Sequence, residues 1–227
     1  MPSNVHYAGP ADLPEEIPVF PLEAVLLLPR GHLPLNIFEP RYLAMVDAAL
    51  AGNRLIGILQ PRAAEGPEAA ELAAVGCVGR ITEFSETGDG RYLITLTGIA
   101  RFRVGEETAS PAPYRTAKVD YVAYEADFQP RIGEDDVDRD ALVKALRAFS
   151  EAREVEIDWG SVARAPTEAL VNALSMMSPY GAKEKQALLE APDLKTRAEL
   201  LVAITEIELS GPDGGSRPDG APKGQTA

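Results

Sequence analysis

Side chains that bind metals or attack substrates are scarce in this sequence. It has one cysteine, Cys77, and two histidines, His6 and His32. A single thiol excludes an intramolecular disulfide, and within a run of valine and glycine we interpret Cys77 as a small core side chain in a reducing cytoplasm. A structural zinc site needs several cysteine, histidine or acidic ligands at suitable spacing. We therefore expect no metal and no cofactor.

Long hydrophobic runs are also missing. No stretch approaches the roughly 18 consecutive apolar residues that indicate a transmembrane helix. The N-terminus, MPSNVHYAGPADLPEEIP, has no basic start followed by an apolar run, so it does not resemble a secretory signal. We expect a cytoplasmic protein without a membrane span.

Short motifs that carry common chemistries are absent too. The sequence has no GxxxxGK[ST] phosphate loop and no GxSxG nucleophile motif. Gly88-Asp89-Gly90 lacks the helix that a phosphate cradle needs and predicts a hairpin turn instead. His32 follows Pro29-Arg30-Gly31, which favours a turn histidine over a general base. The acidic residues 134–140 lack the ligand spacing of a calcium loop and predict a solvated helix start. We therefore expect no enzymatic activity.

Positive charge is the minority throughout the chain. It has 22 basic and 35 acidic side chains, which give a net charge of −13, and neither half of the chain is basic. Such a surface repels the backbones of nucleic acids unless a local basic stripe compensates. Arg101 and Arg103 alternate on a predicted strand, but two arginines are too few. We do not expect a nucleic acid as partner.

What the sequence does contain divides into four segments. Residues 1–14 are polar and residues 211–227 hold eight glycines or prolines among 17 residues, so we predict that both ends are disordered. Residues 15–126 have the pattern of strands, and residues 127–210 have the 3.6-residue period of helices. The chain thus predicts a β subdomain followed by an α-helical subdomain.

Short apolar and β-branched runs predict a curled antiparallel sheet in the first subdomain. Glycines at 88 and 90 predict a hairpin between two long strands. Tyr92, Ile94 and Leu96 should share one face of the second of these strands, and Gly98 should mark a bulge or bend. The predicted strands are residues 17–22, 33–38, 55–60, 75–84, 91–104 and 114–124.

Helix signals recur from residue 40 onward. Pro40 suits the first position of a helix that is inserted among the strands and ends at Gly52. In the second subdomain, apolar residues recur at helical spacing in four segments, and Asp193 is a suitable N-cap for the last. These four helices are predicted from about residue 138 to 149, and over residues 166–177, 183–189 and 194–209.

The stretch LPLNIFEPRYLAMVDAAL contains the candidate site residues Phe38, Glu39, Arg41 and Tyr42. An acid and a base flank Pro40, so the segment is either a reactive site, a peptide-binding surface or a joint between a strand and a helix. Residues two apart on a helix do not face each other, which counts against an acid–base pair. We favour the joint and keep the four residues as a candidate peptide-binding surface.

Exposed apolar surface is the remaining functional signal. The segment IPVFPLEAVLLLP is rich in apolar residues, and Met176, Met177 and Tyr180 form a second apolar group near the C-terminal helices. Both sets are interpreted first as core. The alternative is that some of them line a groove for an apolar peptide.

The string FPLEAVLLLPRGHLPLNIFEPRYLAMVDAAL resembles the opening signature of the Lon protease N-terminal, or LON substrate-binding, domain. The family pattern runs FPL, an apolar run, P-G, LPL-x-IFEPRY and then a helix. The later GRI and GIARF segments and EKQALLEAPDLKTRAELL also resemble that family. The resemblance covers about residues 16–209.

This resemblance implies an α+β fold, with a PUA-like curled antiparallel β-barrel of about six strands and one inserted helix, followed by an α-helical bundle. It also implies a free-standing domain without the ATPase and Ser–Lys peptidase domains of Lon. The expected function is non-catalytic binding of unfolded or apolar polypeptide segments, or of another protein, in protein quality control. The alternative is RNA binding by the PUA-like barrel, which rests on the fold alone.

Overall fold

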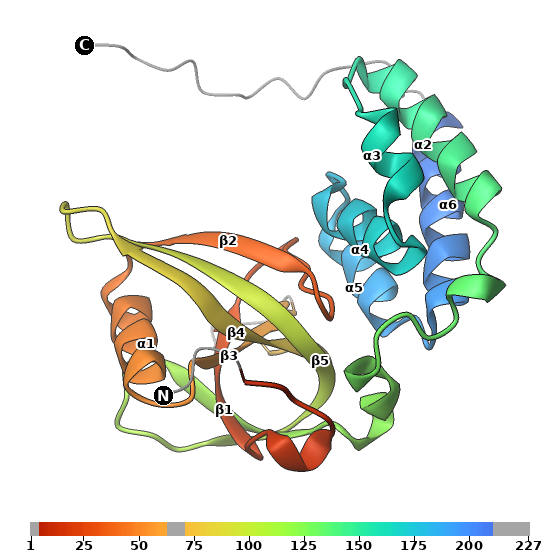
Figure 1. Cartoon of the computed structure of the whole chain (residues 1–227). Helices are drawn as coiled ribbons and strands as arrows, with labels where there is room; N and C mark the ends of the chain where they lie inside the picture. Colours follow the sequence, from red (N-terminus) through yellow and green to blue (C-terminus); the bar gives the residue numbers. More distant parts are fainter. Residues whose placement is uncertain (1–4, 63–70, 211–227) are drawn as a thin grey trace, which may run out of the picture.

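The computed structural model describes residues 5–62 and 71–210 and places a curled sheet beside a group of helices (Figure 1). The strands are β1 (Glu16–Pro21), β2 (His32–Ile37), β3 (Leu55–Leu59), β4 (Val75–Glu86), β5 (Tyr92–Thr108) and β6 (Arg115–Asp120). The α-helices are α1 (Pro40–Ala51), α2 (Arg139–Arg153), α3 (Trp159–Arg164), α4 (Thr167–Met177), α5 (Ala182–Glu190) and α6 (Leu194–Ser210). Three 3-10 helices are η1 (Pro10–Asp12), η2 (Val122–Phe128) and η3 (Glu134–Asp136).

The sheet closes on itself. Its order is β2-β5-β4-β3-β1-β6, and the far end of β5 also pairs with β6, so that five strands form a ring with β2 outside it. The six strands were predicted, but a wholly antiparallel sheet was wrong, because β1 and β3 pair in parallel. A parallel pair needs a crossover connection, and β2 with α1 supplies it.

The inside of the ring is small and filled by side chains. Phe102 lies at its centre, and the cluster around it includes Val19, Leu55 and Ala117, all at most 1% exposed. Gly76 packs closely against the side chain of Phe102. A Cβ at position 76 would lie 2.7 Å from the Phe102 aromatic ring and 2.6 Å from the Ile58 carbonyl oxygen. The barrel is therefore a packed core and encloses no channel for a ligand.

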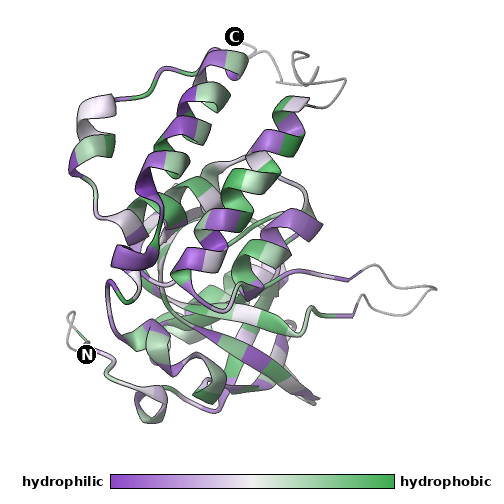
Figure 2. Cartoon of the chain, turned by 90° about the vertical axis from the view of Figure 1, so that its right-hand side faces the viewer, coloured by the Kyte–Doolittle hydropathy of each residue, from purple (hydrophilic) through white to green (hydrophobic). Residues whose placement is uncertain are grey.

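The outer face of the sheet carries a second, larger core. Leu26, Leu27 and Leu28 belong to it and are at most 2% exposed. The prediction that these leucines of the proline-rich segment lie in the core is therefore confirmed. The same cluster contains residues of α1 and of the helical subdomain, such as Met45 and Leu188. Figure 2 shows hydrophobic residues on some faces of the helices and hydrophilic residues on others.

Gly98 marks the bend that was predicted in β5. The β4–β5 register shifts beside it, with Gly98 opposite Gly79 and Ala100 opposite Val78. A Cβ at Gly98 would lie 2.1 Å from the carbonyl oxygen of Leu28, so only glycine lets the leucine segment pass this close. The predicted face of Ile94 and Leu96 is buried, at 3% and 0% exposure.

The helices follow the predictions with one addition. The first helix begins at Pro40, and the Asp193 carboxylate caps α6 by accepting a hydrogen bond from the Thr196 amide at 2.7 Å. Five α-helices follow the sheet where four were predicted. The additional one, α3, has six residues and is too short to show a helical period. Its N-cap, Asp158, accepts hydrogen bonds from the amide (3.2 Å) and hydroxyl (2.5 Å) of Ser161.

Both ends of the chain were predicted to be disordered, and the structure describes part of the N-terminal end only. Of residues 1–14, which we expected to be disordered, the structure describes those from Val5 onward. There η1 is closed by Asp12, whose carboxylate accepts from the amides of Ala8 and Gly9, and Leu13 is 7% exposed against the ring core. An apolar anchor in a polar segment accounts for this order. The predicted tail, residues 211–227, lies outside the described residues.

A buried ion pair joins the sheet to the helices. Arg101 of β5 donates through Nε and Nη2 to both oxygens of Asp127, at 2.8 Å each, and through Nη1 to the carbonyls of Leu189 and Ala191 at the end of α5. Burial alone would lower the pKa of the Arg101 guanidinium, but the hydrogen bond and charge of Asp127 outweigh it and raise that pKa. The Tyr124 ring covers the guanidinium at 4.5 Å.

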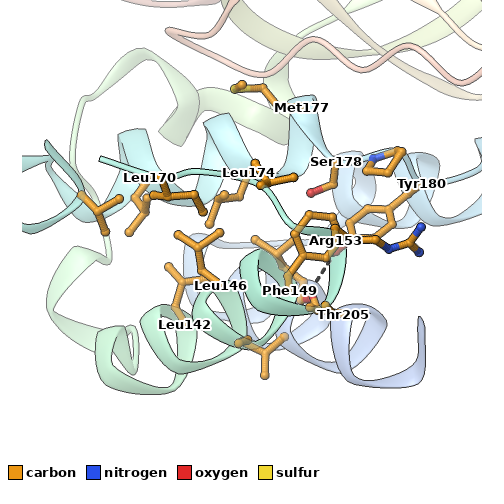
Figure 3. Close-up of a pocket in the computed structure, with 18 of the residues that line it drawn as sticks. Leu142, Leu146, Phe149, Arg153, Leu170, Leu174, Met177, Ser178, Tyr180 and Thr205 are labelled. Carbon is orange, nitrogen blue, oxygen red and sulfur yellow. Dashed lines mark hydrogen bonds between the residues drawn. The ribbon is translucent and has the colours of Figure 1, made fainter. Parts of the chain in front are cut away.

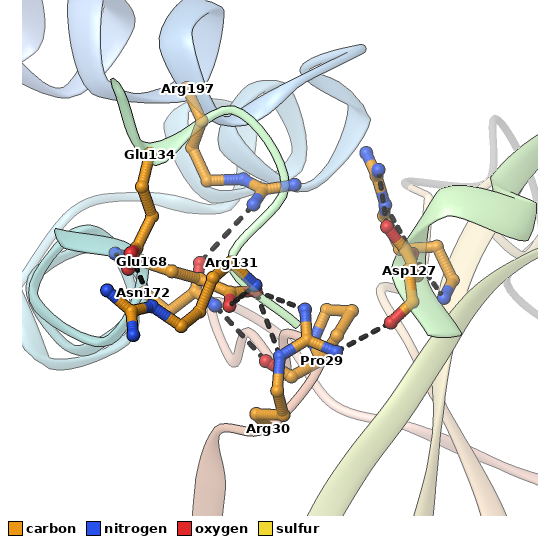
Figure 4. A network of polar contacts seen from close by, with 9 residues as sticks. Pro29, Arg30, Asp127, Arg131, Glu134, Glu168, Asn172 and Arg197 are labelled. Atoms are coloured by element: carbon orange, nitrogen blue, oxygen red, sulfur yellow. Dashed lines mark hydrogen bonds and ion pairs between the residues drawn. The ribbon is translucent and has the colours of Figure 1, made fainter. Parts of the chain in front are cut away.

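A polar network extends this junction (Figure 4). Arg30 donates to the carboxylate of Glu168 on α4 and, at 2.6 Å, to the carbonyl of Asp127. Asn172 of α4 donates to the carbonyl of Pro29 at 3.1 Å. Beside these bonds, Gly31 lies close to the side chain of Met176 on α4. A Cβ on Gly31 would be 2.4 Å from the Met176 sulfur.

We predict that Asp127→Asn destabilises the folded chain by about 3–5 kcal/mol, because Arg101 would stay buried without its counter-charge. Urea denaturation measures the difference. The matched control is Glu107→Gln, which removes the acid of the more exposed Arg115–Glu107 pair and should cost about 1 kcal/mol or less. Equal losses in the two variants would contradict the structural role of the buried pair.

Cys77 should be unreactive in the folded protein. It is 1% exposed, and burial raises the pKa of its thiol well above the usual range, so that little thiolate forms. We predict that an alkylating reagent labels it only as fast as the chain unfolds. Rapid stoichiometric labelling in the absence of denaturant, followed by mass spectrometry, would show that the cysteine is accessible.

A candidate binding pocket in the helical subdomain

The helical subdomain contains a pocket of about 910 Å³, which we call the helical pocket (Figure 3). Its walls come from α2, α3, α4 and α6, from the loop that follows α2 and from the loop between α4 and α5. The lining residues are mostly apolar, and the larger ones are Leu142, Leu146, Phe149, Val155, Ile157, Val162, Leu170, Leu174, Met177, Tyr180, Leu201 and Val202.

Helical periodicity places these side chains. Leu142, Leu146 and Phe149 recur along α2 as the apolar stripe that its sequence predicts, and Leu170 and Leu174 do the same along α4. Around the pocket these stripes are only partly covered by each other. The pocket is the part of these apolar faces that no other described side chain fills.

Two of the large apolar side chains that line this pocket are exposed. Met177 is 82% exposed and Val155 is 48% exposed. The prediction that Met177 faces the core was therefore wrong, because α4 ends there and the chain turns away at Ser178. For Tyr180 core packing is confirmed, since it is 3% exposed and its hydroxyl lies 2.7 Å from that of Thr205.

One arginine lines the helical pocket. Arg153 approaches Glu208 of α6 at 3.4 Å, and its guanidinium lies 5.9 Å from the centre of the Phe149 ring. Its Nε–H is buried and has no hydrogen-bond partner among the described residues. A buried donor without a partner costs stability, so the Arg153 side chain is not fully satisfied by the contacts within the helical subdomain.

The four candidate residues around Pro40 lie on the barrel. Phe38 is 62% exposed, whereas Tyr42 is 8% exposed and packs against Phe20 with ring centres 4.1 Å apart. Burial raises the pKa of the Tyr42 hydroxyl, which Arg41 partly opposes. Tyr42 is therefore core, and only the other three residues can form a surface.

Glu39 and Arg41 form an ion pair at 2.8 Å, although we expected residues two apart not to face each other. The expectation was wrong because Glu39 precedes the helix and has an extended backbone, with ψ of 132°. Arg41 also lies over the Tyr42 ring at 4.5 Å. The pair joins the strand to the helix, and no histidine or cysteine is hydrogen-bonded to it.

The remaining sequence candidates lie apart from one another. His32 is exposed and its Nδ1 lies 3.1 Å from the hydroxyl of Thr97, while Gly88 and Gly90 have the positive φ of a hairpin turn. Arg101 is one of the two arginines that alternate on the predicted strand. It forms a buried ion pair with Asp127 and is not available to a nucleic acid. Among the described residues there is no group of three or more potential metal ligands, and no helix there has the length and apolarity to cross a membrane.

A second, smaller pocket of about 480 Å³ lies at the rim of the barrel. Its polar lining is already engaged, because Arg80 donates to the hydroxyl of Tyr7 and to the carbonyl of Asn53, and Arg30 donates to Glu168. The helical pocket is larger and has an apolar wall, so it is the stronger candidate for a ligand. The helical period of the sequence predicted the apolar stripes of α2 and α4. It did not predict the pocket between them, because the pocket depends on how the helices pack.

Comparison with solved structures supports the same fold. The chain is similar to the Lon N-terminal domain protein from Xanthomonas campestris, with 23% identity and a TM-score of 0.59 over 83% of this chain and 97% of that one. It is also similar to the N-terminal domain of the Mycobacterium avium complex Lon protease, with 20% identity and a TM-score of 0.63 over 84% and 98%.

Comparison of sequences identifies the family. Lon protease 2 of Myxococcus xanthus is 31% identical over 85% of this chain, and Lon protease of Anaeromyxobacter dehalogenans is 30% identical over 85%. The matches cover 24% and 23% of those proteins, so the chain spans about a quarter of their length. Residues 16–206 match the family described as the ATP-dependent protease La (LON) substrate-binding domain, and the chain belongs to this family.

Proposed function

We propose that this chain binds apolar polypeptide segments in the helical pocket and does so without catalysis. The observation that carries the proposal is an apolar pocket of about 910 Å³ in which Met177 is 82% exposed. The family's description as a substrate-binding domain supports a role in recognition. We place this role in protein quality control in the cytoplasm.

The size and lining of the pocket suit this ligand. Pockets of roughly 300–1,000 Å³ with mostly apolar walls are typical of binding sites. Burying one large apolar side chain contributes about 1.5–3 kcal/mol, so two or three such contacts give useful affinity after the cost of ordering the peptide. Met177 is unbranched and polarisable, which lets it adapt to side chains of different shape.

The polar groups of the pocket favour binding over reaction. Nucleophilic catalysis needs a hydroxyl or thiol with a base held beside it. The hydroxyls of Tyr180 and Thr205 are hydrogen-bonded to each other, and among the described residues no base is hydrogen-bonded to the hydroxyl of Ser178, the third in the lining. Neither histidine nor cysteine lines the pocket. The one basic side chain of the lining, Arg153, is paired with Glu208 and is not placed beside a nucleophile.

We predict that Met177→Asp weakens binding of an apolar model peptide by about five- to thirtyfold, because an apolar contact worth about 1–2 kcal/mol is replaced by a charge. Isothermal titration of the folded chain measures the affinity. The substitution should leave stability nearly unchanged, since Met177 is 82% exposed.

Ile207 provides the matched control. It is also an exposed apolar residue on a helix, at 72%, but it does not line the pocket. Ile207→Asp should bind the peptide as the parent does. Phe38→Asp tests the barrel surface, and we expect an effect of less than about twofold. A greater loss from Phe38→Asp than from Met177→Asp would move the site to the barrel, and salt-sensitive binding of RNA with no peptide binding would contradict the proposal.

A further inference from the structure

The charge in the lining of the helical pocket is not balanced. Glu154 and Glu156 line the pocket, both are exposed, and neither forms an ion pair or hydrogen bond through its carboxylate among the described residues. The lining's one basic residue, Arg153, is paired with Glu208 at 3.4 Å. Two carboxylates therefore lie uncompensated beside an apolar cavity.

Local folding does not account for a glutamate at position 154. Glu154 is the C-cap of α2 and has a φ of 52°, a left-handed conformation that glycine or asparagine adopts at lower cost. Its negative charge also lies at the end of the helix where the backbone dipole favours a cation. The side chain lies at a position where it costs stability, and it lines the pocket.

We infer that the helical pocket selects apolar segments that carry lysine or arginine beside the apolar side chains. This inference rests on the proposed function and adds the class of segment. The apolar side chains would fill the cavity between α2 and α4, and the neighbouring cation would lie against Glu154 and Glu156. Each exposed ion pair contributes modestly, so the selection is graded and weakens with salt.

The net charge of −13 by itself attracts cationic peptides, so the test must separate the local carboxylates from the general field. The double variant Glu154→Gln/Glu156→Gln removes two charges at the pocket. Its matched control is Glu86→Gln/Glu125→Gln, which removes two charges from exposed carboxylates that do not line the pocket. Both variants have the same net charge.

The probes are three peptides with one apolar core of leucine and phenylalanine, flanked by lysine, serine or glutamate. For the parent chain we expect the lysine peptide to bind about three- to tenfold more tightly than the serine peptide, and the glutamate peptide to bind most weakly. The pocket variant should lose this lysine preference and keep its affinity for the serine peptide. The control variant should keep the preference. Fluorescence anisotropy at low and high salt measures all affinities.

The outcomes distinguish this inference from the proposed function. Equal binding of the three peptides by the parent, or a lysine preference that both double variants reduce alike, overturns the inference and leaves apolar binding intact. Failure of every peptide to bind the folded chain overturns the proposed function itself.

Glu154→Asn supplies a readout that a structural role would not give. Asparagine tolerates the left-handed conformation and removes the charge at the helix end, so Tm should rise by about 1–4 °C while the lysine preference falls. A variant that loses both stability and the preference would show that Glu154 serves the fold, and that result would contradict the inference.

Discussion

The buried contact between Arg101 and Asp127 fixes how the two parts of the chain lie against each other. A guanidinium that is 4% exposed must have its charge and its donors satisfied, and here the partners come from η2 and from the end of α5. The arginine stands on β5, the strand that pairs with three others. The most connected strand of the sheet is thus tied directly to the helices that follow it.

The two hydrophobic cores do not correspond to the β subdomain and the α-helical subdomain. The ring has its own small interior, but the larger cluster contains Ile58 and Leu96 from the sheet together with Leu170, Leu188 and Leu201 from the helices. Neither part can bury this face alone. The helices that form the pocket are therefore held in place by packing against the sheet, and the pocket depends on a surface that it does not touch.

Local patterns predicted those elements that local interactions determine. Pro40, Asp193 and the glycines at 88 and 90 set a helix start, a cap and a turn, and each occurs as predicted. The parallel pairing of β1 with β3, the exposure of Met177 and the helical pocket depend on how distant elements pack, which no single window of sequence contains. The ion pair of Glu39 with Arg41 was missed because helical spacing was applied to Glu39, although Pro40 was predicted to be the first residue of the helix.

The contact of Gly31 with Met176 has a mechanical meaning. The missing side chain at Gly31 leaves room for the sulfur of Met176 on α4, and Met176 directly precedes Met177, which lines the pocket. A larger residue at position 31 would first have to displace this sulfur, which lies near the end of a flexible side chain in the last turn of α4. The place of the Met176 side chain, one residue before a residue that lines the pocket, therefore depends on glycine at position 31.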